Sequence, residues 1–238
     1  MIVCLDSGNS RIKWGVHDGK QWLAQGALAH AEVKQLQQLL SDWPHPAKVM
    51  LANVAGAEAG ARIRERLGAW LPVLQEARSE HVRCGVTNHY LNPEKLGVDR
   101  WCALIGARGL SRTAAIVVMA GTATTIDTLD AEGNFLGGMI VPGIDLMLRS
   151  LATETAALPF AKGVYAPLPR ATDDAIVSGA IETQVGAIER AFSRLSTANA
   201  HCLLSGGNAA QIGYLLVIPH SVTHNLPLEG LRQLAHDS

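Results

Sequence analysis

The sequence carries no excess of charge of either sign. Lysine and arginine together number 20 and aspartate and glutamate 21, so the formal net charge is -1 at pH 7. A surface without a net field has no general attraction for the phosphates of nucleic acid or for an anionic membrane surface. We therefore expect no nucleic-acid partner and favour a small-molecule ligand.

Long apolar runs and closely paired cysteines are also absent. No run approaches the ~18 apolar residues that a membrane-spanning helix requires, and the opening MIVCL meets Asp6 with no preceding basic segment, which argues against a signal peptide. The four cysteines lie far apart with no C-x-x-C pair, so we expect reduced thiols. These absences predict a cytoplasmic protein that makes no membrane contact.

The apolar residues that are present suffice for a substantial core. Hydrophobic residues make up 48% of the 238 positions and charged residues 17%, as is typical of compact globular proteins. Apolar residues at helical spacing predict helices over 31–43, 57–70 and 92–110, the last capped by Asn92 and interrupted near Gly97. Strand patterns alternate with these helices, which predicts an α/β fold.

Three glycine turns follow strand patterns along the chain. Strands over 2–5 and 11–17 flank the turn DSGNS, and strands over 114–119 and 124–129 flank the turn AGTAT. When Gly8 is aligned with Gly121, Asp6 stands opposite Met119, which suggests an ancient duplication. The third turn, SGGN, joins a strand to a helix and leaves the backbone open to a ligand.

None of these turns is a Walker A loop or a complete G-x-G-x-x-G dinucleotide motif. Together, two glycine hairpins followed by a strand, glycine turn and helix are typical of the actin-like ATPase and sugar kinase superfold. That fold class predicts two duplicated ribonuclease H-like domains, which we assign to residues 1–112 and 113–238.

Six motifs in order along the chain make the resemblance more specific. They are DSGNSRIKW (6–14), YLNPEKLGVDRW (90–101), GTATTID (121–127), GGMIVPG (137–143), ATDDAIVSG (171–179) and SGGN (205–208). The chain resembles the type III pantothenate kinases, the family also known through Bvg accessory factor homologues. The resemblance implies an ATP-dependent kinase, a phosphotransferase with an alcohol group as acceptor. It would convert pantothenate to 4'-phosphopantothenate, the first step of coenzyme A biosynthesis.

The resemblance implies roles for two groups of residues. Asp99 matches the catalytic base, and Arg100 would supply positive charge near the substrate carboxylate or the transferring phosphoryl group. The implied pantothenate-binding residues are Tyr90, Gly97, Val98, Asp99, Arg100 and Thr172. Thr172 is also a plausible N-cap of the helix that follows it.

The implied nucleotide site uses the glycine turns. Its residues are Asp6, Ser7, Gly8, Asn9, Ser10, Arg11, Lys13, Gly121, Thr122, Gly206 and Gly207. Asp6 would hold Mg²⁺, most simply through water, because magnesium keeps much of its hydration shell. Lys13 could instead be only the polar face of a strand, and Asp127 could be a second metal-facing acid or a structural one.

Met119 departs from the family pattern. Family members generally show an aspartate at this position, which is associated with a monovalent cation such as K⁺ or NH₄⁺. A thioether is a poor ligand for a hard cation that prefers oxygen. We therefore expect the monovalent-cation site to be lost at Met119, so that ATP and Mg²⁺ suffice.

Two further readings stay open. One is another kinase of the same superfold that acts on a sugar or a small acid, against which the 90–101 segment argues. The other is a catalytically weak or inactive regulatory homologue of this kinase family. The resemblance also implies a homodimer with the substrate site close to the partner subunit.

Overall fold

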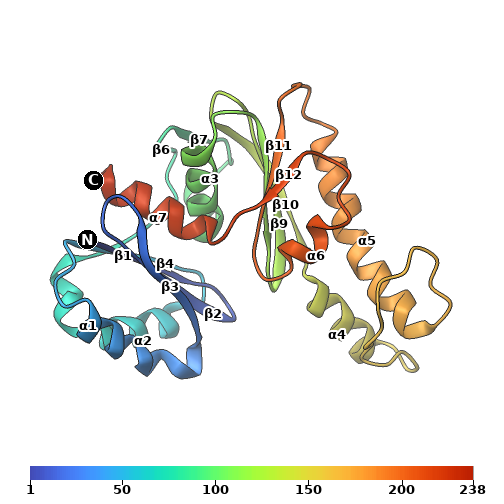
Figure 1. The fold of residues 1–238 in the computed structure, drawn as a ribbon, viewed down its shortest axis with the longest axis horizontal. Helices are drawn as coiled ribbons and strands as arrows, with labels where there is room; N and C mark the ends of the chain where they lie inside the picture. The colour runs from blue at the N-terminus through green and yellow to red at the C-terminus, as the bar shows by residue number, and fades with distance from the viewer. Residues whose placement is uncertain (238) are drawn as a thin grey trace. The chain divides into compact units, whose positions relative to one another are not determined.

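The computed structural model describes residues 1–237, which form two compact units (Figure 1). Unit 1 contains Met1–Arg112, Gly133–Phe135 and the chain from Asn225 onward; unit 2 contains Thr113–Glu132 and Leu136–His224. The boundary expected after residue 112 coincides with the first of these divisions. The C-terminal segment, however, belongs to unit 1 rather than to the second half. That the units are duplicated ribonuclease H-like domains stays a prediction.

Unit 1 is built on a five-stranded sheet. In order of pairing its strands are β3 (Trp22–Ala29), β2 (Arg11–His17), β1 (Ile2–Ser7), β4 (Lys48–Asn53) and β5 (Leu74–Glu76). The β1–β2 pair is antiparallel, as the expected hairpin requires, whereas β1–β4 is parallel. The turn around Gly8 therefore projects from the end of a central strand.

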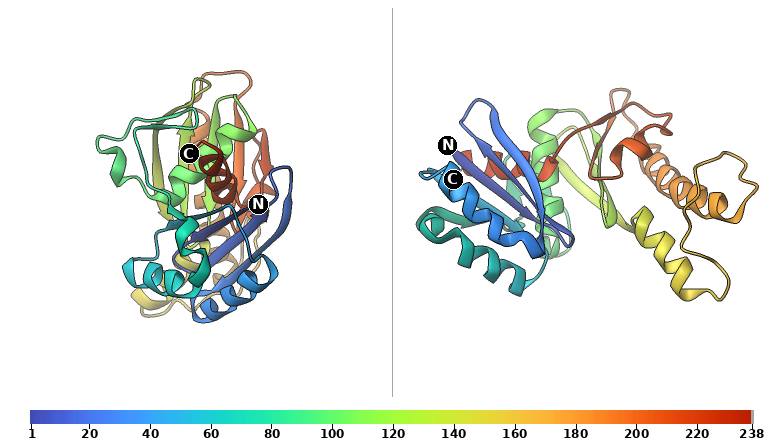
Figure 2. Two further views of the ribbon diagram at one scale, coloured as in Figure 1. Left: turned by 90° about the vertical axis from the view of Figure 1, so that its left-hand side faces the viewer. Right: turned by 60° about the horizontal axis from the view of Figure 1, so that its bottom comes forward.

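Helices cover both faces of this sheet (Figures 1 and 2). On one face lie α1 (Leu36–Asp42) and α2 (Ala57–Leu67), whose Leu36 and Ile63 pack in the same core cluster as Val3 and Leu5 of β1. On the other face lie α7 (Leu226–His236) and α3 (Val98–Leu110), which pack against each other. Because strand side chains alternate, Asp6 points to the α3 face when Leu5 points to the α1 face.

The helices expected over 31–43 and 57–70 are each a mixture of helix types. A 3₁₀ segment, η1 (His30–Gln35), precedes α1, and another, η2 (Gly68–Val73), follows α2 and contains Pro72. The α-helix α2 ends at its C-cap, Gly68, whose φ of 47° departs from α-helical geometry. The two helical regions are therefore confirmed, while their α-helical parts are shorter.

The segment leading into α3 is interrupted as expected at Gly97. A 3₁₀ turn, η3 (Pro93–Lys95), is followed by extended Leu96, and α3 then begins with Gly97 as its N-cap. Asn92 is the N-cap of η3 with Pro93 at the first helical position, as expected, although the Asn92 side chain makes no capping hydrogen bond. Upstream, β6 (Val82–Arg83) and β7 (Val86–Asn88) form a short hairpin that pairs with the start of β10 (Asn134–Pro142).

Unit 2 contains a second sheet with helices packed on one face. In order its strands are β12 (His220–Val222), β11 (His201–Ser205), β8 (Ala115–Ala120), β9 (Ala123–Leu129) and the remainder of β10. Its helices are α4 (Ile144–Glu154), α5 (Thr172–Phe192) and α6 (Ala209–Gly213). Ile116, Val118 and Ala120 of β8 pack in one cluster with these helices. Met119 therefore lies on the opposite face.

The structure bears on two further expectations, the start of the helix at Thr172 and the absence of a membrane-spanning helix. The N-cap of α5 is Ala171, and Thr172 is the first helical residue, so the capping role considered for Thr172 is wrong. None of the helices described in residues 1–237 is long and apolar enough to span a membrane.

Candidate active site

The N-terminal hairpin presents a polar turn at the end of β1. Asp6 stands opposite Lys13 in the strand register, and Gly8 closes the turn by donating its N–H to the carbonyl oxygen of Arg11 at 3.1 Å. His30 lies beside the turn, with a ring nitrogen 2.7 Å from the Gly8 carbonyl oxygen. Asn9, Ser10 and Arg11 are exposed, whereas Ser7 is fully buried.

Asp6 has a buried carboxylate, one oxygen of which accepts no hydrogen bond. Its side chain is 5% exposed, and Oδ1 has no hydrogen-bond partner. Burial raises the pKa of Asp6 to about 6, which the nearby Lys13 partly opposes and the charge of Asp99 reinforces. A buried carboxylate oxygen of this kind fits the oxygen ligands that Mg²⁺ takes, directly or through water.

Asp99 lies in the first turn of α3, on the same face of the unit 1 sheet as Asp6. Its negative charge contributes to the raised pKa of Asp6. Gly97 makes room for it, since a Cβ at Gly97 would lie 2.6 Å from the Asp99 Oδ1. The expected GVDR segment is therefore a helix start whose glycine accommodates the carboxylate two residues later.

Arg100 is held by two aromatic side chains. The residue is 4% exposed, and its guanidinium donates through Nη1 to the Tyr90 hydroxyl at 2.8 Å. Its Cζ lies 5.4 Å from the Tyr90 ring centroid and 5.8 Å from that of Phe135. The structure thus brings together two residues expected from the sequence, Tyr90 and Arg100, and adds Phe135, for which the sequence carried no signal.

Asn88 is a second residue that the sequence did not reveal. It is fully buried, and its Oδ1 accepts the backbone N–H of Tyr90 at 3.1 Å. Its Nδ2 donates to the carbonyl oxygens of Glu80 and Pro93 at 3.2 and 3.1 Å. One carboxamide therefore fastens three parts of the loop that carries Tyr90.

In unit 2, the second and third glycine turns adjoin each other. Gly206 has φ +108°, and a Cβ there would overlap the backbone of Ala120 at the end of β8. The N–H of Asn208 bonds to the Ala120 carbonyl oxygen at 3.1 Å. Gly121 and Thr122, which follow Ala120, are exposed and therefore open to a ligand. The expected phosphate turns thus share one backbone scaffold.

Met119 has a hydroxyl-bearing residue directly opposite it on each neighbouring strand. In the strand register it stands opposite Thr125 of β9 and Ser205 of β11. Thr125 Oγ1 is buried without a hydrogen-bond partner. Asp127, two residues farther along β9, is fully buried opposite Val117. Among residues 1–237, no cluster of three or more His, Cys, Asp or Glu side chains could hold a metal ion.

Thr172 lies in unit 2 on a groove between two helices. The groove has a volume of about 530 Å³ and runs between α4 and α5, with Met147, Leu151 and Ile176 among its lining residues. Thr172 is exposed at its edge. The substrate-contacting residues expected from the sequence are therefore divided, with Thr172 in unit 2 and the others in unit 1.

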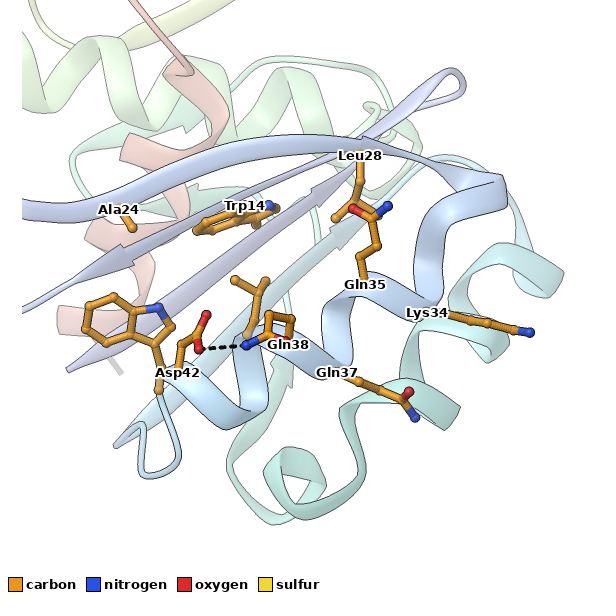
Figure 3. A pocket seen from close by; sticks show the side chains of 10 residues that line it. Trp14, Ala24, Leu28, Lys34, Gln35, Gln37, Gln38 and Asp42 are labelled. Atoms are coloured by element: carbon orange, nitrogen blue, oxygen red, sulfur yellow. Dashed lines mark hydrogen bonds between the residues drawn. The ribbon is translucent and has the colours of Figure 1, made fainter.

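A larger groove in unit 1 contains none of the expected site residues. It measures about 870 Å³ and lies between β2, β3 and α1, with Trp14, Leu28 and Trp43 along it (Figure 3). The Trp14 indole packs closely on Gly26 of β3, where a Cβ would come within 2.6 Å of the ring. Gln38 donates to Asp42 at 2.8 Å across its rim (Figure 3).

Comparisons with known proteins agree with these motifs. The family model described as type III pantothenate kinase matches residues 2–194. A type III pantothenate kinase from Dechloromonas aromatica (strain RCB) is 71% identical over 235 residues, covering 99% of each chain.

Solved structures share the fold at low identity. A protein from Campylobacter jejuni described as a Baf family transcriptional activator has a TM-score of 0.65 at 19% identity, covering 98% of this chain and 97% of its own. A protein from Sinorhizobium meliloti described as a 2-dehydro-3-deoxygalactonokinase has a TM-score of 0.58 at 15% identity, covering 98% and 96%. The fold is thus that of the actin-like ATPases and sugar kinases, and the chain belongs to the type III pantothenate kinase family.

Proposed function

We propose that this chain transfers the terminal phosphoryl group of ATP to the primary hydroxyl of pantothenate. The observation that carries the proposal is the GVDR start of α3, where Asp99 interacts electrostatically with the buried Asp6 and Arg100 follows in the same helical turn. Phosphoryl transfer passes through a loose transition state, so positioning and charge neutralisation supply most of the catalysis. Few reactive side chains are needed for it.

Asp99 accepts the proton of the pantothenate hydroxyl in this proposal. A carboxylate within hydrogen-bond reach orients the hydroxyl and takes its proton late in the transfer, as the leaving oxygen of ATP departs. Arg100 places a fixed positive charge toward an anionic oxygen, either the pantothenate carboxylate or the transferring phosphoryl group. The hydrogen bond from Arg100 to Tyr90 supports a shared substrate-binding surface.

The nucleotide phosphates contact the glycine turns. In unit 1 we assign this role to the Asp6 to Arg11 turn with Lys13, and in unit 2 to Gly121, Thr122, Gly206 and Gly207. Mg²⁺ neutralises phosphate charge when bound, and Asp6 would hold it, most simply through water. The unpartnered Oδ1 of Asp6 supports that assignment.

A monovalent cation is not required in this proposal. Met119 offers sulfur where a hard cation needs oxygen, and its strand neighbours Thr125 and Ser205 offer only neutral hydroxyls. We also propose a homodimer, with Thr172 contributing to pantothenate binding. The exposed groove beside Thr172 supports a contact in that region. A cytoplasmic location stays a prediction.

A coupled assay with purified protein, ATP, Mg²⁺ and pantothenate tests the function. We expect turnover by the unaltered chain, and its loss by at least a hundredfold in Asp99→Asn, since general-base catalysis contributes about 10²- to 10⁴-fold. Glu94→Gln is the matched control, because Glu94 is an exposed acid in the same segment. No turnover of pantothenate in any salt would favour the regulatory alternative, and turnover of a sugar instead would favour the other kinase reading.

A further inference from the structure

Phe135 reaches the candidate substrate site from a strand that otherwise belongs to unit 2. It is the second residue of β10, and its side chain is fully buried. Gly133–Phe135 group with unit 1, whereas β10 from Leu136 onward groups with unit 2. The ring of Phe135 lies 5.2 Å from the ring of Tyr90, with an angle of 37° between the planes.

The backbone of Phe135 is fixed as firmly as its side chain. It pairs with Asn88 in the β7–β10 register, and its carbonyl oxygen accepts the N–H of His89 at 3.2 Å. Asn88 in turn holds the N–H of Tyr90. Phe135 and Tyr90 are therefore fastened to one short piece of sheet, and their rings have little freedom to move apart.

The guanidinium of Arg100 lies near the rings of both Tyr90 and Phe135. Its Cζ lies within 6 Å of each ring centroid, the range in which an aromatic quadrupole attracts a cation. This attraction is stronger where water is excluded, and the Arg100 side chain is only 4% exposed. The Tyr90 hydroxyl fixes Nη1 of the guanidinium, and the Phe135 ring supplies a second constraint on the orientation of its plane.

We propose that Phe135 is a positioning residue that orients the guanidinium of Arg100 for an anionic oxygen of the substrate. This inference rests on the proposed function for Arg100 and adds to it. Phe135 touches no reacting atom in this account, and it acts only through Arg100. Its ring electrons, not only its volume, are what the site requires.

Graded fluorination tests the role of the ring electrons. Phenylalanine carrying one, two or three ring fluorines at position 135 keeps nearly the same size while its quadrupole weakens. We expect kcat/KM for pantothenate to fall stepwise with fluorination, by about tenfold over the series, because each added fluorine weakens the attraction between the ring and the Arg100 guanidinium. The same analogues at Phe160, which is half exposed, are the control and should leave the rate unchanged. A flat series at position 135 would overturn the proposal.

A double-mutant cycle tests whether Phe135 acts through Arg100. Phe135→Leu should lower kcat/KM for pantothenate about tenfold in the unaltered chain and less than twofold in an Arg100→Lys background. Ile63→Val serves as a folding control, because Ile63 is equally buried in the core cluster beneath the five-stranded sheet. It should lower stability without changing either kinetic constant. Equal losses in both backgrounds would show independent action and contradict the inference.

A spectroscopic measurement separates this inference from the proposed function. The side-chain N–H signal of Arg100, assigned by its loss in Arg100→Lys, should be shifted by the ring current of Phe135 and should move in Phe135→Leu. It should not move in Ile63→Val. If the unaltered chain fails to phosphorylate pantothenate, the proposed function is wrong. The Arg100 signal then tests the contact between Phe135 and Arg100 without any measurement of activity. A signal unchanged in Phe135→Leu would overturn it.

Discussion

Gly143 donates its backbone N–H to the carbonyl oxygen of Thr122 at 2.9 Å. The contact fixes the start of α4 against the turn expected to bind phosphate. A Cβ at Gly143 would come within 2.6 Å of the Thr122 carbonyl oxygen and closer still to that of Gly121. Only glycine lets the two backbone segments approach in this way.

Gly143→Ala should therefore weaken ATP use selectively. Overlap with backbone atoms cannot be relieved by a side-chain rotation, so the 121–122 turn must shift. We expect KM for ATP to rise by about tenfold, which corresponds to ~1.4 kcal/mol, with KM for pantothenate little changed. Steady-state kinetics with each substrate varied in turn measure this. Gly186→Ala is the control, because a Cβ at this site on α5 meets no neighbouring atom within 4 Å. An unchanged KM for ATP in Gly143→Ala would contradict the expectation.

Asn88→Asp should loosen the loop that carries Tyr90. The carboxylate can still accept the Tyr90 N–H, but it cannot donate to the carbonyl oxygens of Glu80 and Pro93. We expect a loss of about 2–4 kcal/mol in the free energy of unfolding, together with a raised KM for pantothenate. Urea unfolding and kinetics at neutral pH measure both. The same change at exposed Asn92, which makes no capping bond, should leave both nearly unaltered. Equal effects at the two positions would refute the loop-fastening role.

His17 should make the protein less stable as the pH falls. Burial lowers the pKa of His17, and Arg232 and His236 lower it further, against the opposing influence of Glu229 and Asp18. Its Nδ1 accepts the N–H of Gly19 at 3.0 Å, which requires that nitrogen to be unprotonated. Below the unfolded pKa of about 6.5 the unfolded chain binds a proton that the native chain does not. Stability is therefore lost as the pH falls through 6.5 toward the lower native pKa.

Thermal unfolding between pH 7.5 and 5 measures this dependence, and no more than ~1.4 kcal/mol per pH unit can come from one histidine. The stability of His17→Gln should depend less steeply on pH over this range than the stability of the unaltered chain. His45→Gln, at an exposed position, should keep the original slope. If stability changes with pH as steeply in His17→Gln as in the unaltered chain, groups other than His17 cause the dependence.

Potassium should not accelerate the reaction of the unaltered chain. Rates in sodium-free Tris with and without KCl, at ionic strength matched by tetramethylammonium chloride, should agree within about twofold, because sulfur binds hard cations poorly. Met119→Asp would place a carboxylate between the hydroxyls of Thr125 and Ser205 and should introduce a response to K⁺. Met119→Leu introduces no oxygen ligand, so its rate should not change when K⁺ is added. Strong activation of the unaltered chain by K⁺ would contradict the expected loss of the monovalent-cation site at Met119.

Local patterns were sufficient for the two glycine hairpins. Alternating side chains and turn residues predicted β1, β2, β8 and β9, because the features that specify a hairpin lie within a few residues of each other. Asn92 occupies the expected N-cap position, but of the 3₁₀ turn η3 rather than of α3. The capping role of Thr172 was wrong, since a residue type that favours caps need not adopt the capping geometry. The start of α3 is set by Gly97 and the start of α5 by Ala171.

Long-range packing was beyond the reach of the sequence. Nothing near Phe135 indicates that it meets Arg100, which is 35 positions away, or that Asn88 would be buried with its carboxamide fully bonded. Gly143 belonged to a recognised motif, but its role follows only from the backbone that lies against it.

The sequence by itself determined the family and the fold class, and it named Asp6, Asp99 and Arg100 as candidate site residues, because short motifs specify local geometry and the chemical groups it presents. Only the tertiary structure decided which of these groups are neighbours and what supports them. It placed Asp6 beside Asp99 across a sheet and a helix, set Arg100 against Phe135, and returned α7 to the first unit. Burial and electrostatic proximity arise from chain segments that are distant in sequence, and no local pattern encodes them.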